Sequence, residues 1–142
     1  MMDELELARA CAEKMWEDDQ ASQGMGMRID DIAPGFAQLS MTIRDDMING
    51  QKIAHGGCIF TLADSTFAFA CNTYNQFTVA QQCSVNFIAP AFLDDRLTAT
   101  AKERQKFGRS GIYDVTVTNQ SGEIIAEFRG MSRTVKGNHV EI

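Results

Sequence analysis

The residue best suited to chemistry is an acidic side chain in the most apolar segment of the chain. Residues 58–71 are apolar apart from a few hydroxyl side chains and one charged residue, Asp64. An unpaired carboxylate is costly to bury, so Asp64 must be partnered, protonated or open to a polar cleft. A structural aspartate bonded to a nearby backbone or hydroxyl group fits this pattern as well as a catalytic one.

The segment His55-Gly56-Gly57 precedes the apolar run and has the pattern of a helix start. Two glycines let a ligand approach the backbone closely, and the free N–H groups at a helix start favour a negatively charged oxygen. A Gly-Gly pair before a helix is common, so this feature gains weight only through its spacing from Asp64.

Gly57 and Asp64 are seven residues apart, close to two helical turns, so both lie on one face of a helix. They are also separated by about 10 Å along the axis, from a rise of ~1.5 Å per residue. Attack on a carbonyl requires a separation of about 3–3.5 Å, so Asp64 cannot attack a carbonyl held by Gly57 of its own chain. If the pair is catalytic, Asp64 comes from a second copy whose helix lies antiparallel beside the first, and the protein is at least a dimer.

The elements that must position these residues follow from the hydrophobic pattern. Apolar residues at three- and four-residue steps predict a helix over about 3–20. Alternation and apolar runs predict strands over about 37–44, 79–88, 97–102, 113–118 and 124–133. Short turns between the last strands indicate antiparallel neighbours. The run 58–71 is apolar nearly all round, which predicts a central helix buried on every side and wrapped by one curved antiparallel sheet. The fold class is α+β, in a single domain over 1–142 with a disordered tail over about 136–142.

The net charge and the spacing of the cysteines indicate which binding partners and which cellular compartment to expect. The chain of 142 residues carries 19 acidic and 13 basic residues, a net charge of −6, so we expect no binding to nucleic acid or to anionic membranes. The four cysteines show no disulfide or metal-ligating spacing. The N-terminus is acidic, unlike a signal peptide, and no segment has the length of a membrane span. We therefore expect a cytoplasmic protein with reduced thiols.

A set of short motifs runs in order over most of the chain. It comprises Asn49-Gly50, His55-Gly56-Gly57-x6-Asp64, Ala68-x-Ala70-Cys71-Asn72, Phe87-x-x-Pro90, Gly111-Ile112-Tyr113-Asp114 and Phe128-Arg129-Gly130. From about residue 15 to 135 this order resembles the hotdog-fold acyl-CoA thioesterases of the PaaI type (phenylacetic acid degradation). The resemblance implies a long helix wrapped by a bent sheet, dimers that join their sheets edge to edge, and homotetramers formed from two dimers.

The resemblance also implies a reaction: hydrolysis of an aromatic (phenylacetyl-type) or medium-chain acyl-CoA to the free acid and CoA. The Gly57 N–H would polarise the thioester carbonyl, and Asp64 from the second subunit would be the nucleophile or the base that activates water. Asn49 would orient the water or the substrate, Gly56 would contact the substrate, and His55 would bond near the thioester and hold the loop. The chemistry would suit a carboxylate, because a thiolate leaves readily and needs little help from an acid. No metal or cofactor would be needed.

Candidates for further contacts with the substrate are chosen by the chemistry of their side chains. For the phosphates of CoA, the turn Lys106-Phe107-Gly108-Arg109-Ser110-Gly111 is the best local supply of cationic and backbone N–H groups, with Arg133 and Lys136 as second choices. Candidates for the acyl pocket are Phe60, Phe67, Met47 and Ile48, each of which also fits an ordinary core position. One position departs from the family pattern: where some relatives place a serine that holds the attacking water, this chain has Ala80, with Gln81 or Ser84 as substitutes.

Three alternatives use the same residues differently. Cys58, at the helix start, could act as a nucleophile through a lowered pKa, with His55 as its base. His55 and Asp64 could instead form the acid–base pair of a hotdog hydratase or dehydratase, although the Gly-Gly start matches thioesterases better. A non-catalytic acyl-CoA-binding protein would show no turnover, and an Asp64→Asn substitution would change little.

Overall fold

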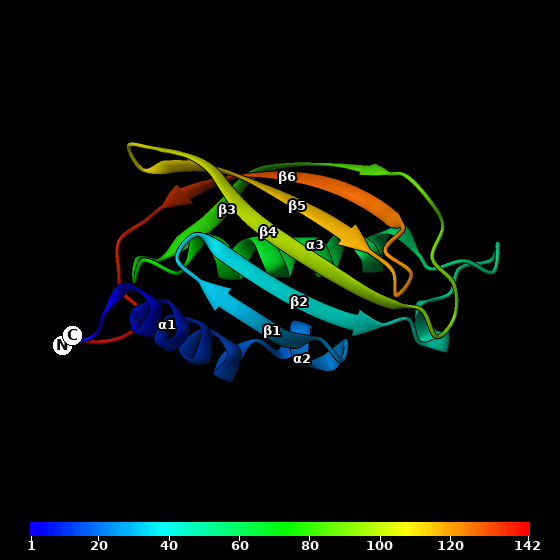
Figure 1. The fold of residues 1–142 in the computed structure, drawn as a ribbon, viewed down its shortest axis with the longest axis horizontal. Helices are drawn as coiled ribbons and strands as arrows, with labels where there is room; N and C mark the ends of the chain where they lie inside the picture. Colours follow the sequence, from blue (N-terminus) through cyan, green and yellow to red (C-terminus); the bar gives the residue numbers. More distant parts are fainter.

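One curved antiparallel sheet forms the framework of the protein (Figure 1) in a computed structural model that describes residues 1–142. Its six strands lie in the order β1-β2-β4-β5-β6-β3, and every neighbouring pair is antiparallel. The strands are β1 (Arg28–Ala33), β2 (Phe36–Thr42), β3 (Thr78–Phe87), β4 (Arg96–Phe107), β5 (Ser110–Thr118) and β6 (Ile124–Thr134). The expected α+β fold is confirmed, and β3 forms one edge of the sheet.

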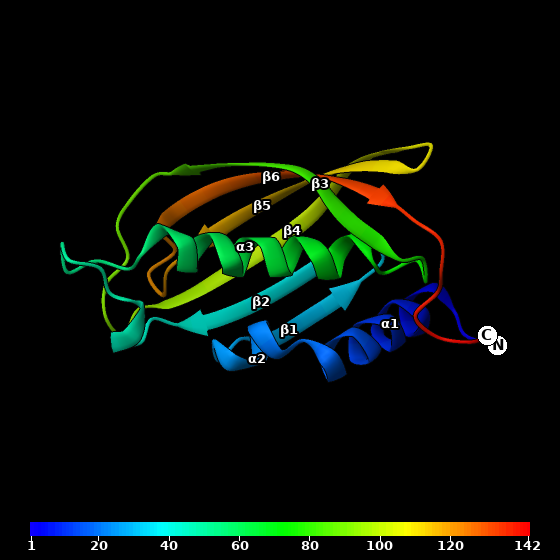
Figure 2. The ribbon, with the colours of Figure 1, turned by 180° about the vertical axis from the view of Figure 1, so that it is seen from behind.

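The two faces of the sheet differ as the alternation predicts. Along β5, Tyr113, Val115 and Val117 are buried, while the residues between them are only half-buried on the opposite face. The helix α3 (Gly56–Cys71) lies across the inner face (Figure 2). Its buried side chains include Leu62 and Phe67, which complete an apolar layer between helix and sheet. This burial provides the main driving force for wrapping the sheet around the helix.

The sheet covers only one side of α3, which differs from the expected burial on every side. Gly57 is exposed, and Thr61, Asp64 and Ala68 are half-buried. These four residues follow one another at three- or four-residue steps and therefore share one helix face; we call them the open stripe of α3. Gly57 and Asp64 thus lie on the same face, as their spacing predicts.

The N-terminal region contains two helices, α1 (Glu4–Asp18) and α2 (Gln20–Gly24), rather than the single helix expected over about 3–20. The break is at Asp19, whose carboxylate accepts the Ser22 N–H (2.9 Å) and so caps α2. The Ser22 hydroxyl in turn lies 2.8 Å from the Ser65 hydroxyl, which ties α2 to α3. No helix of the protein combines the length and the hydrophobicity that a bilayer crossing requires.

β1 is a strand that the sequence pattern does not reveal. Its pairing with β2 shifts register between Ile29 and Asp31, so the alternation of apolar and polar residues is interrupted. The turn to β2 contains Gly35 at a φ of +66°, with Tyr74 and Glu103 so close that a side chain would clash. The bulge explains why the region does not have the period of a regular strand.

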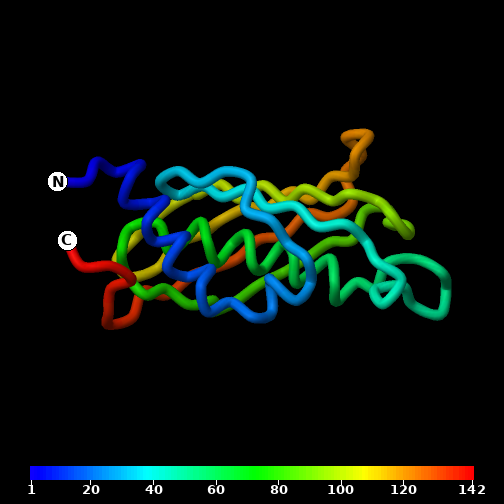
Figure 3. The backbone as a smooth tube through the Cα atoms, turned by 90° about the horizontal axis from the view of Figure 1, so that it is seen from below, coloured from blue at the N-terminus to red at the C-terminus, as the bar shows by residue number.

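The C-terminal tail packs against the protein, unlike the disordered segment expected over about 136–142. The backbone N–H groups of His139 and Val140 donate to Asn75 Oδ1 (2.9 and 3.0 Å). His139 Nε2 lies 2.7 Å from Asn72 Oδ1, and its ring packs edge-on against Phe77. Figure 3 shows both chain termini at the same end of the molecule. Single side-chain contacts hold this segment, and such contacts leave no periodic signal in a sequence.

Candidate active site

The loop before α3 is anchored on both sides of the candidate site. The His55 N–H donates to the Met47 carbonyl and the Ala54 N–H to the Ala91 carbonyl, both at 2.8 Å. The His55 carbonyl accepts the Cys58 N–H (2.9 Å), and His55 Nδ1 accepts the Gly57 N–H (2.9 Å). His55 is therefore the N-cap of α3, the position that Ser, Thr, Asp or Asn most often occupies.

This cap changes what the Gly57 amide can do. Its N–H is already paired, so a substrate oxygen reaches it only after the exposed His55 ring rotates away. Such a rotation is fast, because exposed side chains change rotamer in ps–ns. The Gly56 N–H, one residue earlier, has no acceptor within the chain. The helix start therefore offers one free amide and one amide that His55 controls.

Asn49 is held in a tight turn that fixes the use of its side chain. Asn49 Oδ1 accepts the backbone N–H groups of Gln51 (2.9 Å) and Ile53 (3.4 Å). The Asn49 N–H donates to the Ile53 carbonyl (2.9 Å), which closes the turn. Because the amide oxygen is engaged, the Nδ2 group is the part of this side chain that remains for a ligand.

A cleft of about 460 Å³ opens between this turn, the start of α3 and the end of β3. Its lining consists of Asn49, Ile53, Ala54, Gly56, Ile59, Phe87, Ile88, Ala89 and Pro90. None of these side chains is charged, and Asn49 is the only polar one. A larger hollow of about 630 Å³ lies between α1 and β1, but it contains none of the candidate catalytic residues. The motif Phe87-x-x-Pro90 was the sequence signal for two of the lining residues.

Asp64 lies on the open stripe, two turns along α3 from Gly57. Its carboxylate forms no hydrogen bond or ion pair within the chain, and burial raises its pKa above the ordinary value of 3.8. Burial, and then the nearby Asp64 charge, raise the pKa of the Cys83 thiol on β3. The chain therefore does not supply the bonded partner that a purely structural aspartate would have.

Cys58 has the opposite of the environment that a nucleophilic cysteine needs. Burial, followed by the charge of Asp46, raises the pKa of the Cys58 thiol, whereas a reactive cysteine has a lowered pKa. His55, its only candidate base, uses Nδ1 to cap the Gly57 amide. The alternative of a cysteine nucleophile with a lowered pKa is contradicted.

The apolar candidates for the acyl pocket occupy the interior. Phe67 is 1% exposed, with its ring centre 5.7 Å from that of Tyr113 and 5.8 Å from that of Phe128. Phe60 is half-buried and packs edge-on against Phe128 at 5.4 Å. Met47 is also buried. The rings of Phe60 and Phe67 belong to the apolar layer between helix and sheet. Neither these rings nor Met47 line the cleft beside Asn49.

The turn between β4 and β5, which contains the residues proposed for CoA binding, lies at the end of the molecule opposite to the start of α3 (Figures 1 and 2). Gly108, at a φ of +60°, forms the turn between β4 and β5. Lys106 Nζ lies 3.8 Å from the centre of the Tyr74 ring. Arg109 is exposed at the turn, and Ser110 pairs with Arg133 across β5 and β6. Within one protomer these groups are remote from Asn49 and Gly57.

Ala80, which stands where some relatives have the serine that holds the attacking water, lies on β3. The pairing of β3 with β6 shifts register between Ala80 and Gln82, so Gln81 lies in a bulge. Ser84 pairs with Arg129, whose exposed side chain marks the outer face of the sheet. Ser84 therefore faces away from α3. Of the two substitutes, this leaves Gln81 as the candidate to replace the serine.

Comparisons with known proteins agree on one family. The family model described as the thioesterase superfamily matches residues 51–126. The acyl-coenzyme A thioesterase PaaI of Escherichia coli (strain K12) is 40% identical over 126 residues, which are 89% of this chain and 90% of that protein. The solved structure of the E. coli PaaI protein from the phenylacetic acid degradation operon matches with a TM-score of 0.92 and 39% identity, covering 93% of this chain and 96% of that one. A mutant of the phenylacetic acid degradation protein PaaI from Thermus thermophilus matches with a TM-score of 0.77 and 32% identity, covering 80% and 97%.

Proposed function

The chain belongs to the thioesterase superfamily and has the hotdog fold, and from this premise we propose that it hydrolyses acyl-CoA thioesters to free acid and CoA. The observation that carries the proposal is the Asp64 carboxylate, half-buried and without a partner on the same helix face as the glycine start of α3. The name of the E. coli relative, an acyl-coenzyme A thioesterase, supports the same activity.

The start of α3 would hold the thioester carbonyl. The oxygen would accept the Gly57 N–H once His55 rotates away, with the free Gly56 N–H and Asn49 Nδ2 as further donors. Donors aimed at the oxygen stabilise the negative charge that develops there in the tetrahedral intermediate. His55 would both keep this amide ordered in the empty site and contact the substrate after it moves.

Asp64 of the partner subunit would activate the attacking water. In this scheme the carboxylate takes a proton from water, the water oxygen bonds to the carbonyl carbon, and collapse of the oxyanion breaks the C–S bond. The departing thiolate then takes up the proton. The raised pKa of Asp64 supports the general-base role, because a more basic carboxylate removes a proton more readily.

Two copies of the chain would be needed to complete each site. The separation of Gly57 and Asp64 along one helix, about 10 Å from ~1.5 Å per residue, prevents them from acting on one carbonyl. An antiparallel arrangement of two α3 helices, with the open stripes facing, would place Asp64 of each near Gly57 of the other. It would also bring the turn with Lys106, Gly108, Arg109 and Ser110 toward the partner's helix start, where it could bind the CoA phosphates. We propose a homodimer of this kind, paired into a homotetramer and located in the cytoplasm.

The first test is a panel of acyl-CoA substrates read by thiol release, with the wild type beside Asp64→Ala. We expect turnover of phenylacetyl-CoA or medium-chain acyl-CoA by the wild type and loss of nearly all turnover in the variant. A wild type that releases no thiol from any substrate is a binding protein, and preference for hydration of an enoyl-CoA indicates a hydratase. Either outcome overturns the proposal.

Mixed oligomers test the shared site directly. Asp64→Asn and Asn49→Ala subunits are each expected to be impaired alone. After unfolding and refolding together, half of the dimers are hybrids in which one of the two sites has both native residues, so activity recovers to about one quarter of the wild type. A mixture that stays as inactive as its components would show that both residues serve one chain's own site.

A further inference from the structure

Phe87, the last residue of β3, is a large apolar side chain on the surface of the protomer, 53% exposed. Its ring lies directly on the backbone of Gly56 at the start of α3. A Cβ atom placed on Gly56 would be 3.2 Å from Phe87 Cζ, which is closer than ordinary contact. The glycine at position 56 therefore lets the aromatic ring close one side of the cleft, beside the free Gly56 N–H.

The rest of the cleft is lined by apolar side chains. Ile53, Ile59 and Ile88 line it together with Pro90, and no charged side chain contributes. An acyl group that carried its own carboxylate would lose its hydration there without gaining a cation. The single polar side chain, Asn49, is committed through its oxygen to the backbone of its own turn. The cleft thus suits an uncharged apolar group attached to a carbonyl that lies at the helix start.

We propose that Phe87 is the residue that determines acyl specificity, forming the aromatic wall of a pocket for an uncharged, flat acyl group such as an arylacetyl or aroyl group. The inference rests on the proposed function and deepens it. A flat ring gains edge or offset contacts with the Phe87 ring, which a flexible chain makes less well. The pocket adjoins the carbonyl-binding groups, because Gly56 and Asn49 line the cleft.

The test compares kcat/KM for phenylacetyl-CoA, hexanoyl-CoA and succinyl-CoA in the wild type and in Phe87→Leu. We expect the wild type to prefer phenylacetyl-CoA and to turn over succinyl-CoA poorly. Phe87→Leu should lower the ratio of phenylacetyl-CoA to hexanoyl-CoA by about tenfold, the scale of a changed apolar contact in a specificity pocket. Phe92→Leu is the matched control, because Phe92 is 52% exposed but does not line the cleft, and its ratio should stay at the wild-type value.

A second pair of variants tests the contact between Phe87 and Gly56. Gly56→Ala keeps the backbone N–H but presses on the ring, so it should shift the same ratio, and the double variant with Phe87→Leu should show a smaller shift than the two single changes combined. Sedimentation of each variant reports its oligomeric state.

The outcomes separate the two proposals. A wild type without turnover overturns the proposed function and this inference with it. Turnover with an unchanged substrate ratio in Phe87→Leu, or an equal loss for all three substrates together with loss of oligomers, overturns the role of Phe87 alone, and the second result would make it a subunit contact.

Discussion

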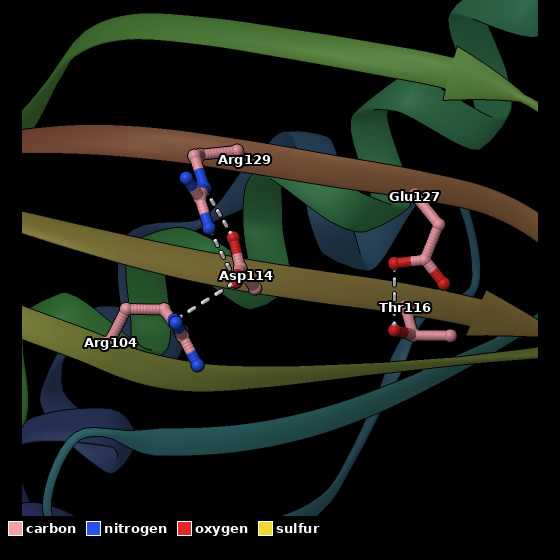
Figure 4. Close-up of polar contacts among 5 residues, drawn as sticks. All are labelled: Arg104, Asp114, Thr116, Glu127 and Arg129. Carbon is pink, nitrogen blue, oxygen red and sulfur yellow. Dashed lines mark hydrogen bonds and ion pairs between the residues drawn. The ribbon is translucent and has the colours of Figure 1, made fainter.

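Two aspartates in this protein lie in opposite environments. On the outer face of the sheet, Asp114 binds Arg129 through two hydrogen bonds (2.6 and 2.9 Å) and Arg104 at 3.5 Å (Figure 4). The bond from Arg129 is the main reason that the pKa of Asp114 is lowered. On the open stripe of α3, Asp64 has no partner within its chain, and burial raises its pKa.

The difference distinguishes a carboxylate that supports the fold from one that is available for chemistry. Asp114 is stabilised in its charged form by neighbours on adjacent strands, and the adjacent pair Thr116 and Glu127 (3.1 Å) is likewise satisfied within the sheet. Asp64 keeps its lone pairs unused and gains basicity from burial, a combination that is typical of functional sites.

The largest expected effect is on turnover. Asp64→Asn should lower kcat by about 100- to 10,000-fold, the contribution of a positioned general base. Asp114→Asn is the matched control, since it removes the same charge from an exposed ion pair, and it should leave kcat within about twofold of the wild type. Thiol release from phenylacetyl-CoA under saturating conditions measures both. Equal effects of the two substitutions would remove the functional distinction between the aspartates.

A smaller effect is expected at the helix start that Asp64 would serve. His55→Ala removes the acceptor of the Gly57 N–H, so the free energy of unfolding should fall by about 1 kcal/mol, the usual contribution of an N-cap. We expect kcat/KM to fall as well, because the amide and its loop lose order. His55→Asn retains a capping oxygen and should recover the stability but only part of the activity. Chemical denaturation at fixed protein concentration is the measurement, and an unchanged stability in His55→Ala would contradict the capping role.

The smallest effects concern stability as a function of pH, and they have opposite signs. The folded pKa of Asp114 is lowered, so its stabilisation is present above the ordinary carboxyl pKa and is lost as the pH falls through the folded value. Asp114→Asn should therefore destabilise the protein at pH 7 by at most about 1 kcal/mol, a limit set by solvent screening. The folded pKa of Asp64 is raised, so ionisation destabilises the fold as the pH rises through that value. Asp64→Asn should accordingly stabilise the protein at pH 7.

Denaturation of these two variants and the wild type between pH 4 and pH 8 tests this comparison. The Asp64 difference should shrink toward pH 4, where the native Asp64 carboxyl group approaches neutrality. The Asp114 difference should persist over this range, because the lowered pKa keeps the native Asp114 carboxylate charged there. Two changes of the same sign at pH 7 would show that Asp64 has a stabilising partner in the assembled protein.

The sequence by itself determined the features that depend on local periodicity. The later strands follow from the alternation of apolar residues, and α3 follows from a long apolar run after a helix-start pattern. The placement of Gly57 and Asp64 on one helix face follows from the helical repeat. The same repeat established that one chain cannot bring those two residues to a single carbonyl. These inferences needed no knowledge of what packs against what.

Only the tertiary structure decided the features that depend on contacts between distant segments. Three examples are the bulge in β1, the anchoring of the tail by Asn75 and the packing of Phe87 on Gly56. In each case the local sequence around the residues gives no indication of the contact. The raised pKa of Cys58 and the capped Gly57 amide likewise follow from burial and from one imidazole orientation. Burial and hydrogen-bond pairing are properties of a packed arrangement, and a linear pattern specifies them only where the arrangement is periodic.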